Sequence, residues 1–339
     1  MTQRGRKPSR LRIEDVARAA GVSPITVSRA IGNPGRVSEA TRFKVLEAVS
    51  KTGYVVNTHA SSLATGKSSL IPVFVSNLRN PHFATALQGA SDAFEGSRFH
   101  LLMAHTNYSD RLELEMLNSL LSFQPAAAMF TGIVQSEQAR EMLRGLDIPV
   151  VEMWDFSLSP LDMLVGFSNA EGGRLMGEHF GAQNFTSIAY AGRTKDRGAQ
   201  RLSGFQEELA LYGKSTDLVL ALEGPRTTDD GGAALDEILS RNPEIDAIFF
   251  ATDSLAIGAI MRARDRRLDV PGRLAIAGYG DLDTAKQIVP ALTTIHVASY
   301  EMGLKAGQML RTRLENKAVS SNILRTPVSL EVRASTSRR

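Results

Sequence analysis

Basic side chains gather in one short stretch that could hold a negatively charged small molecule. Arg193, Lys195, Arg197 and Arg201 lie within nine residues of one another. A guanidinium group holds a carboxylate through two parallel hydrogen bonds, which suits arginine to this task. The alternative is that some of these side chains only solvate a loop, and we expect this of Lys195 at least. The stretch as a whole favours the binding of an anion.

Residue types that could carry catalysis are not arranged for it. Gly278 and Gly280 lack the third glycine of a dinucleotide-binding motif, and neither a P-loop nor a Gly-x-Ser-x-Gly motif occurs. The chain has no cysteine, and no metal-ligand spacing is found among its six histidines, His59, His82, His100, His105, His179 and His296. We therefore predict that the protein is not an enzyme and has no catalytic residue, metal or cofactor.

Length and composition are those of an ordinary globular chain. Its 339 residues are 43% hydrophobic and 22% charged, which is enough for two or three hydrophobic cores. No apolar run reaches the roughly 18 to 20 residues that span a bilayer. The arginine-rich N-terminus also lacks the apolar stretch of a secretory signal. We expect no membrane partner and a cytoplasmic location.

Charge is divided unevenly along the chain. Residues 1–67 hold twelve Lys and Arg against four Asp and Glu, a net charge of +8. Because the whole chain carries +3, residues 68–339 carry −5. A basic end on an acidic body is typical of a nucleic-acid-binding module attached to a separate domain.

Two short helices are predicted early in this basic end. Apolar residues recur at helical spacing over 13–20, and Gly21 ends that helix. Ser23 followed by Pro24 is the pattern of an N-cap with proline in the first turn, so a second helix begins there. Residues 33–35, Asn-Pro-Gly, end it.

A third helix follows directly. Ser38 is its expected N-cap and Gly53 its C-terminal glycine. We expect its apolar side to consist of Phe43, Val45, Leu46 and Val49.

The first two helices have the layout of a helix-turn-helix. Small Ala17 lets the helices approach, Gly21 permits the turn, and Val27 returns to the shared core. The second helix could then enter a major groove, where only Arg29 could read guanine with two hydrogen bonds. Its outward residues would be Pro24, Ile25, Ser28 and Arg29. Many helical hairpins share this spacing, so the pattern alone leaves a purely structural pair of helices open.

After residue 69 short apolar runs alternate with amphipathic helical stretches, which is typical of parallel α/β sheets. So many strands in about 270 residues favour two lobes over one sheet. The expected strands are 71–76, 100–104, 126–131, 150–153, 187–191, 218–222, 247–251 and 274–277.

The N-terminal motifs closely resemble the headpiece of the lactose/galactose repressor family. The resemblance rests on Asp15-Val16-Ala17, Gly21-Val22-Ser23, Thr26-Val27-Ser28-Arg29, Val37-Ser38, Thr41-Arg42 and Gly53-Tyr54-Val55-Val56-Asn57, and it continues through essentially the whole chain. It implies an all-α helix-turn-helix headpiece over 1–56, a hinge helix or linker over 57–67, and an effector-binding and dimerisation domain over 68–339.

The resemblance also implies how the protein would bind DNA. In the family, a leucine of the hinge helix wedges into the minor groove of the operator, and Leu63 stands at that place. An apolar wedge partly unstacks a base step and kinks the duplex. The implied contacts are Ser23, Pro24, Ile25, Thr26, Ser28, Arg29, Asn57 and Leu63. The implied state is a homodimeric regulator, most simply a repressor, on double-stranded operator DNA and hence at the nucleoid.

The body of the family resembles a type I periplasmic sugar-binding protein, with two α/β lobes and a ligand between them. Strand ends and helix N-termini converge at such a crevice. The implied lobes run from 68 to about 164 with a late return, and from about 165 to 290, joined by three crossings of the chain.

Several positions match effector-binding motifs of the family. Arg201, three residues before Gly204, aligns with a ligand-contacting arginine, and Thr252 departs from the usual asparagine before Asp253. Gly280 replaces an aspartate that many members place there, which removes a charge that would repel an anion. Aromatic rings that could stack on a sugar include Tyr108, but we expect only Phe83 and Trp154 at the cleft. The full set of implied effector residues is Phe83, Trp154, Phe167, Arg197, Arg201, Thr252, Asp253, Gly280 and Asp281.

The implied effector is an anionic sugar acid such as gluconate or a ketogluconate. Residues 148–155, 165–169 and 275–278 are especially similar to the gluconate repressor branch. Two alternatives stay open, a regulator that responds to a neutral sugar and a solute-binding protein without DNA function. The basic headpiece argues against the second.

Overall fold

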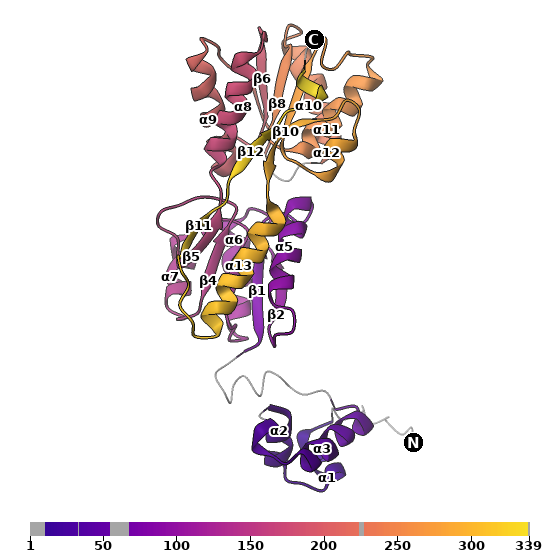
Figure 1. Ribbon diagram of the computed structural model, residues 1–339, viewed down its shortest axis with the longest axis vertical. Coiled ribbons are helices and arrows are strands. Elements are labelled where there is room, and N and C mark those ends of the chain that lie inside the picture. Colours follow the sequence, from indigo (N-terminus) through magenta and orange to yellow (C-terminus); the bar gives the residue numbers. More distant parts are fainter. Residues whose placement is uncertain (1–10, 33, 55–67, 224–226, 338–339) are drawn as a thin grey trace, which may run out of the picture. The chain divides into compact units, whose positions relative to one another are not determined.

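The computed structural model describes residues 11–32, 34–54, 68–223 and 227–337. The chain divides into two compact units, Met1–Ser68 and Ser69–Arg339, which are shown in Figure 1. The expected hinge helix over 57–67, with Asn57 and Leu63, lies outside the described residues.

The first unit contains the three expected helices, α1 (Ile13–Ala20), α2 (Pro24–Gly32) and α3 (Glu39–Thr52), with a short 3-10 turn, η1 (Pro34–Arg36). Gly21 and Gly53 end α1 and α3 in the left-handed conformation, with φ of 65° and 68°, which glycine adopts without strain. Ser38 Oγ accepts a hydrogen bond from the Thr41 backbone N–H at 3.3 Å. These ends were predictable because caps depend on neighbouring residues alone.

The core of this unit is small and apolar. It consists of the buried residues Val16, Ala17, Val27, Ala30, Val45 and Ala48. The expected apolar side of α3 was wrong in part, because Phe43 is 71% and Leu46 is 46% exposed. Each helical residue turns about 100°, so Phe43 lies almost opposite Val45, whereas Ala48 shares its face.

The second unit contains two six-stranded sheets (Figure 1). The first has the order β11-β5-β4-β3-β1-β2 and the second β12-β10-β9-β8-β6-β7. The first sheet consists of β1 (Leu70–Val75), β2 (His100–His105), β3 (Ala128–Phe130), β4 (Val150–Met153), β5 (Met163–Gly166) and β11 (Ile323–Arg325). The second consists of β6 (Ile188–Gly192), β7 (Leu218–Ala221), β8 (Ala247–Phe250), β9 (Ala275–Gly280), β10 (Thr293–Val297) and β12 (Val328–Glu331).

Every described strand pair is parallel except β10 with β12. All eight expected strands are present, and most of their ends lie within two residues of the expected ends. The sequence did not reveal β5, β10, β11 and β12. These strands are short, and β10 reads Thr-Thr-Ile-His-Val, so neither an apolar run nor a clean alternation marks it.

Helices complete each lobe. The first lobe contains α5 (Pro81–Ala93), α6 (Asp110–Leu121), α7 (Glu137–Arg144) and α13 (Ser299–Leu314). The second contains α8 (Asn169–Ala182), α9 (Asp196–Leu211), α10 (Thr228–Arg241), α11 (Asp253–Asp265), α12 (Asp283–Gln287) and the 3-10 turn η2 (Ala334–Thr336). Helices α5 and α13 approach closely, since a Cβ on Gly303 would lie 1.8 Å from the Ala86 carbonyl oxygen.

The chain passes between the lobes three times, after β5, after β10 and between β11 and β12 (Figure 1). The number of crossings agrees with expectation, but two expected lobe ends need correction. A boundary at 164/165 falls inside β5, which belongs wholly to the first sheet. The second lobe also extends beyond residue 290, because β10 pairs with β9.

Candidate functional site

A cleft lies between the two lobes, where the carboxyl ends of several strands meet. The space between its walls that no atom fills is about 970 Å³, open solvent at its mouth included. Eight of the nine effector residues expected from the sequence line it: Phe83, Trp154, Phe167, Arg197, Arg201, Thr252, Asp253 and Gly280.

The ninth expected residue, Asp281, is not among the lining residues. Its carboxylate is buried and accepts hydrogen bonds from Arg333 Nη2 at 2.6 Å and His296 Nδ1 at 2.9 Å. Although burial opposes its ionised form, these two partners hold the pKa of Asp281 below its usual range. Asp281 therefore joins β9, β10 and the C-terminal segment of its own lobe.

Arg197 lies in the cleft without a neutralising partner. Its Nη1 donates to the carbonyl oxygen of Thr131, in the opposite lobe, at 3.0 Å. Asp155 and Asp196 act on it electrostatically, but among the described residues no carboxylate forms an ion pair with it. Burial lowers the pKa of this half-buried guanidinium, and a partly desolvated cation without a counter-charge is costly. Arg197 is therefore suited to pair with an anion that enters the cleft.

Arg201, four residues further along α9, is already bonded. Its Nε donates to Asn169 Oδ1 at 2.9 Å and its Nη1 to the Ala251 carbonyl oxygen at 2.6 Å. Its guanidinium carbon also lies 3.8 Å from the centre of the Tyr279 ring. Two of the hydrogen-bond donors of Arg201 are thus used within its own lobe, in the wall of the cleft.

The other two basic residues of the stretch are neutralised or exposed. Arg193 Nη2 lies 2.6 Å from Asp196 Oδ2, and its Nη1 lies 3.7 Å from Glu223 Oε2. Lys195 is largely exposed and lies 3.8 Å from Glu223 Oε1. Lys195 therefore solvates the loop, as expected from the sequence.

Thr252 and Asp253 serve the framework of the cleft as well as its wall. Thr252 Oγ1 caps α11 by accepting from the Leu255 N–H at 3.5 Å. Asp253 is buried, and it accepts from the Leu282 N–H at 2.7 Å and from Thr294 Oγ1 at 2.5 Å. Burial raises the pKa of Asp253 to about 6.

Aromatic rings form the apolar part of the wall. Phe83 and Trp154 pack edge to face, with ring centres 4.6 Å apart, and both are buried. Phe167, which belongs to the expected effector set, lines the cleft as well, and so does Tyr108, which that set left out. Tyr108 was hard to place because it follows β2 in a loop with positive φ.

His82, which sequence reasoning passed over in favour of Phe83, also lines the cleft. Its Nδ1 lies 2.9 Å from Ser299 Oγ. Its Nε2 is buried and has no hydrogen-bond partner among the described residues. Burial, followed by the positive charge of Arg201, lowers the pKa of His82 to about 4.

The first unit presents a separate polar surface on α2. Ser23 Oγ accepts from the Thr26 N–H at 3.1 Å and shares a hydrogen bond with Thr26 Oγ1 at 2.9 Å, so these residues fix the turn before the helix. Ile25 is 64% exposed, and Pro24, Ser28 and Arg29 are exposed beside it. The outward set expected from the sequence is thus solvent-accessible.

Comparison with known proteins agrees with this architecture. Residues 12–57 match the bacterial regulatory proteins of the lacI family, and residues 178–336 match a periplasmic binding protein-like domain. The HTH-type transcriptional regulator GntR of Pseudomonas aeruginosa is 32% identical over 333 residues, which are 98% of this chain and 97% of that protein. The chain belongs to the lacI family.

Two further relatives support this lacI-family assignment. GntR of Escherichia coli is 30% identical over 94% of this chain and 96% of its own length. The crystal structure of a LacI-family transcriptional regulator from Silicibacter pomeroyi is 30% identical, with a TM-score of 0.91, over 97% of this chain and all of that one. The protein is therefore a LacI-family transcriptional regulator, with a DNA-binding helix-turn-helix and a two-lobed periplasmic-binding-like domain.

The described residues contain neither a membrane-spanning helix nor a metal-binding cluster. Within them, no helix is long and apolar enough to cross a membrane. Over the same ranges, no group of three or more acidic, histidine or cysteine side chains could hold a metal ion.

Proposed function

We propose that this LacI-family regulator is a repressor whose operator affinity is controlled by a sugar acid, such as gluconate or a ketogluconate. The observation that carries the proposal is Arg197, a half-buried guanidinium in the cleft without an ion-pair partner among the described residues. A carboxylate from a ligand supplies the missing charge and accepts paired hydrogen bonds.

The charge around the cleft supports an anion over a neutral sugar. Arg197 and Arg201 are one helical turn apart on α9 and both line the cleft. Asp253 is the one acidic residue that lines it within the described chain, and its oxygens accept hydrogen bonds from its own lobe. Gly280 contributes no charge. The sequence similarity to the gluconate repressor branch, with relatives named GntR, points the same way.

Control of DNA binding follows from where Arg197 bonds. Its hydrogen bond to Thr131 joins the two lobes directly. A ligand that binds this guanidinium favours one arrangement of the lobes, and it changes operator affinity by its differential affinity for the two arrangements. Through the headpiece, Ser23, Pro24, Ile25, Thr26, Ser28 and Arg29 contact operator DNA, with Asn57 and Leu63 contributing from the segment outside the described residues.

We also propose that the protein works as a homodimer, because one helix-turn-helix reads one half-site. A surface suited to a second copy lies on β2, the outer strand of the first sheet. Leu102 and Met103 are successive residues whose side chains point to opposite faces, yet both are exposed. Both faces of this outer strand are therefore uncovered in one chain.

A thermal-shift screen of the full-length protein with sugar acids and matched neutral sugars tests the effector. A bound ligand at 100 times its dissociation constant adds about 2.7 kcal/mol to the free energy of unfolding. We expect stabilisation by D-gluconate or a ketogluconate and none by D-glucose. Operator release or capture by the same acid, measured by fluorescence anisotropy, connects binding to control. Stabilisation by neutral sugars alone contradicts the proposal.

A further inference from the structure

We propose that His82 contacts the effector through Nε2 and takes up a proton when an anionic effector binds. This rests on the proposed function and goes beyond it, because it names a second anion-binding residue and a pH dependence of effector affinity. The carrying observation is geometric: the buried Nε2 of this cleft-lining histidine has no hydrogen-bond partner among the described residues and lies against Gly280, which also lines the cleft.

Hydrogen bonding fixes which ring nitrogen carries the proton in the unliganded protein. Ser299 Oγ lies 3.3 Å from the Val297 carbonyl oxygen, which can only accept, so the Ser299 hydroxyl donates its one hydrogen there. The same Oγ must then accept at 2.9 Å from His82 Nδ1. Nδ1 is therefore protonated, and the lone pair on Nε2 of the neutral ring has no donor among the described residues.

A neutral Nε2 and a carboxylate oxygen both accept hydrogen bonds, so they cannot satisfy one another. A protonated ring can donate to the carboxylate and gains a charge-assisted bond. An anion in the cleft also offsets the positive charge of Arg201, one of the causes that hold the pKa of His82 down. Binding of an acid and protonation of Nε2 are therefore coupled.

Position supports this pairing. His82 and Phe83 are neighbours in the first turn of α5, and the Arg197 guanidinium carbon lies 5.6 Å from the centre of the Phe83 ring. The Arg201 charge acts on His82 directly. A carboxylate bound by Arg197 would therefore lie near Phe83, the neighbour of His82 in the chain.

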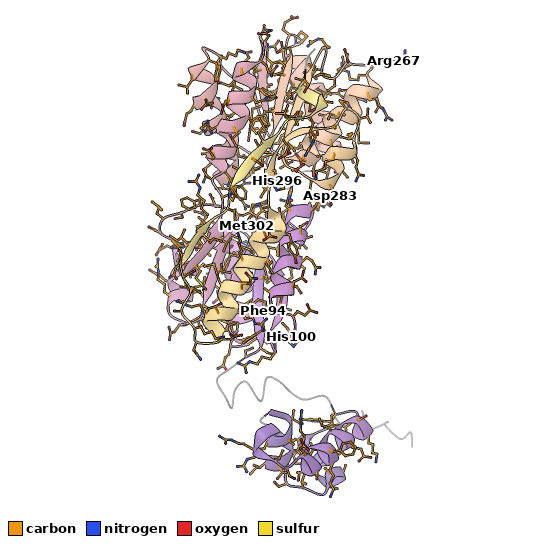
Figure 2. The ribbon with its side chains drawn as sticks, in the orientation of Figure 1. Phe94, His100, Arg267, Asp283, His296 and Met302 are labelled. Atoms are coloured by element: carbon orange, nitrogen blue, oxygen red, sulfur yellow. The ribbon has the colours of Figure 1, made fainter. Side chains whose placement is uncertain are left out.

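Other titratable groups near His82 also act on its pKa. Besides Arg201 of α9, these are Asp281 after β9, Asp283 of α12 and His296 of β10. Figure 2 shows Asp283 and His296 where the two lobes meet. Asp281 and His296 are bonded to each other. Among the described residues that line the cleft, Asp253 is the one carboxylic acid, and its pKa of about 6 makes it the main rival source of proton uptake.

The sign of the pH effect follows from linkage. If binding raises the pKa of His82, the protonated protein binds the acid better, so affinity rises as pH falls from the bound toward the free pKa. The rise is at most about tenfold per pH unit. Above the bound pKa the effect disappears.

Calorimetry of full-length protein with potassium D-gluconate as probe measures the coupling. Titrations at one pH in phosphate and in Tris, which differ in ionisation enthalpy, count the protons taken up. We expect uptake of up to one proton per chain in the wild type and none in His82→Gln, which keeps a hydrogen-bonding group but does not titrate. Lys195→Gln, at a largely exposed residue that does not line the cleft, should behave as the wild type.

A second measurement separates this role from a structural one. Ring-nitrogen NMR should show Nε2 of His82 unprotonated in the free protein and protonated with D-gluconate bound. Equal proton uptake by wild type and His82→Gln overturns the inference and points to Asp253. Binding without His82-dependent uptake contradicts this inference alone, whereas binding of no sugar acid contradicts the proposed function and this inference with it.

Discussion

His82 occupies the space that any side chain at position 280 would need. A Cβ on Gly280 would lie 2.1 Å from His82 Nε2, and Gly280 itself has a φ of 135°, a conformation that other residues rarely adopt. The two residues come from opposite lobes, α5 and β9. Gly280, which replaces the aspartate of many family members, is thus also a point of contact between the first lobe and the second.

This contact predicts a coupled effect of two substitutions. Gly280→Ala should weaken D-gluconate binding at least about tenfold, because the lobes cannot close on one another as they do here. In a His82→Ala background, Gly280→Ala should reduce the free energy of effector binding by less, because the opposing ring is gone and only backbone strain remains. The difference between the two backgrounds should be about 0.5 to 3 kcal/mol. A double-mutant cycle of effector affinity by calorimetry measures the difference. Purely additive effects would show that the contact does not constrain binding.

Gly280→Asp should abolish the response to the acid, because it adds a negative charge as well as bulk. Operator binding without effector should persist in both variants.

A comparison of the two cleft arginines predicts different outcomes for similar changes. Arg197→Gln should weaken effector binding by about 2 to 5 kcal/mol, because it leaves the ligand carboxylate unpaired in a partly desolvated site. Its melting temperature should hardly change, since among the described residues Arg197 donates its hydrogen bond to a single backbone carbonyl, that of Thr131. Lys195→Gln is the matched control and should leave effector affinity unchanged.

Arg201→Ala should instead lose stability as well as effector response. It removes bonds to Asn169 and Ala251 and the stacking on Tyr279, which together are worth about 1 to 3 kcal/mol of unfolding free energy. Denaturant titration of both variants separates the roles. An Arg197→Gln protein that binds D-gluconate normally would remove the basis of the anionic assignment.

The sequence predicted those parts of the structure that depend on local chemistry. Caps such as Ser38 and Gly21 depend on neighbouring residues, and the convergence of parallel strand ends placed Phe83 and Trp154 at the cleft. The division of labour between Arg197 and Arg201 depends on Thr131, Asn169 and Ala251, which lie far away along the chain. His82 could not be singled out because its importance arises from Gly280 and Ser299 in space.

Base reading by the headpiece predicts a specific loss for Arg29→Ala. Arg29 is exposed on α2, where it can bond guanine, so its removal should cost about 1 to 3 kcal/mol of operator affinity and relax specificity at one base position. Arg42→Ala, which removes a basic side chain from α3, serves as comparison. If Arg42 contacts phosphate, this variant should weaken specific and non-specific DNA binding alike. Anisotropy titrations with operator variants and unrelated DNA at several salt concentrations distinguish the two. Unchanged base preference in Arg29→Ala would exclude direct readout by this side chain.

The outer strand β2 predicts how the dimer can be broken. Met103 is 55% exposed in one chain, and a second copy packed on β2 would bury it. Met103→Glu should then place an unpaired charge in that interface and weaken dimerisation by at least about 2 kcal/mol, which is about thirtyfold in the dissociation constant. Operator affinity should fall with it, because a monomer contacts one half-site, while effector binding should persist because Met103 does not line the cleft. Leu211→Glu, at an exposed apolar residue of the second lobe, controls for loss of surface hydrophobicity. Sedimentation equilibrium with and without operator DNA gives both constants, and a Met103→Glu protein that remains as dimeric as the Leu211→Glu control would place the interface elsewhere.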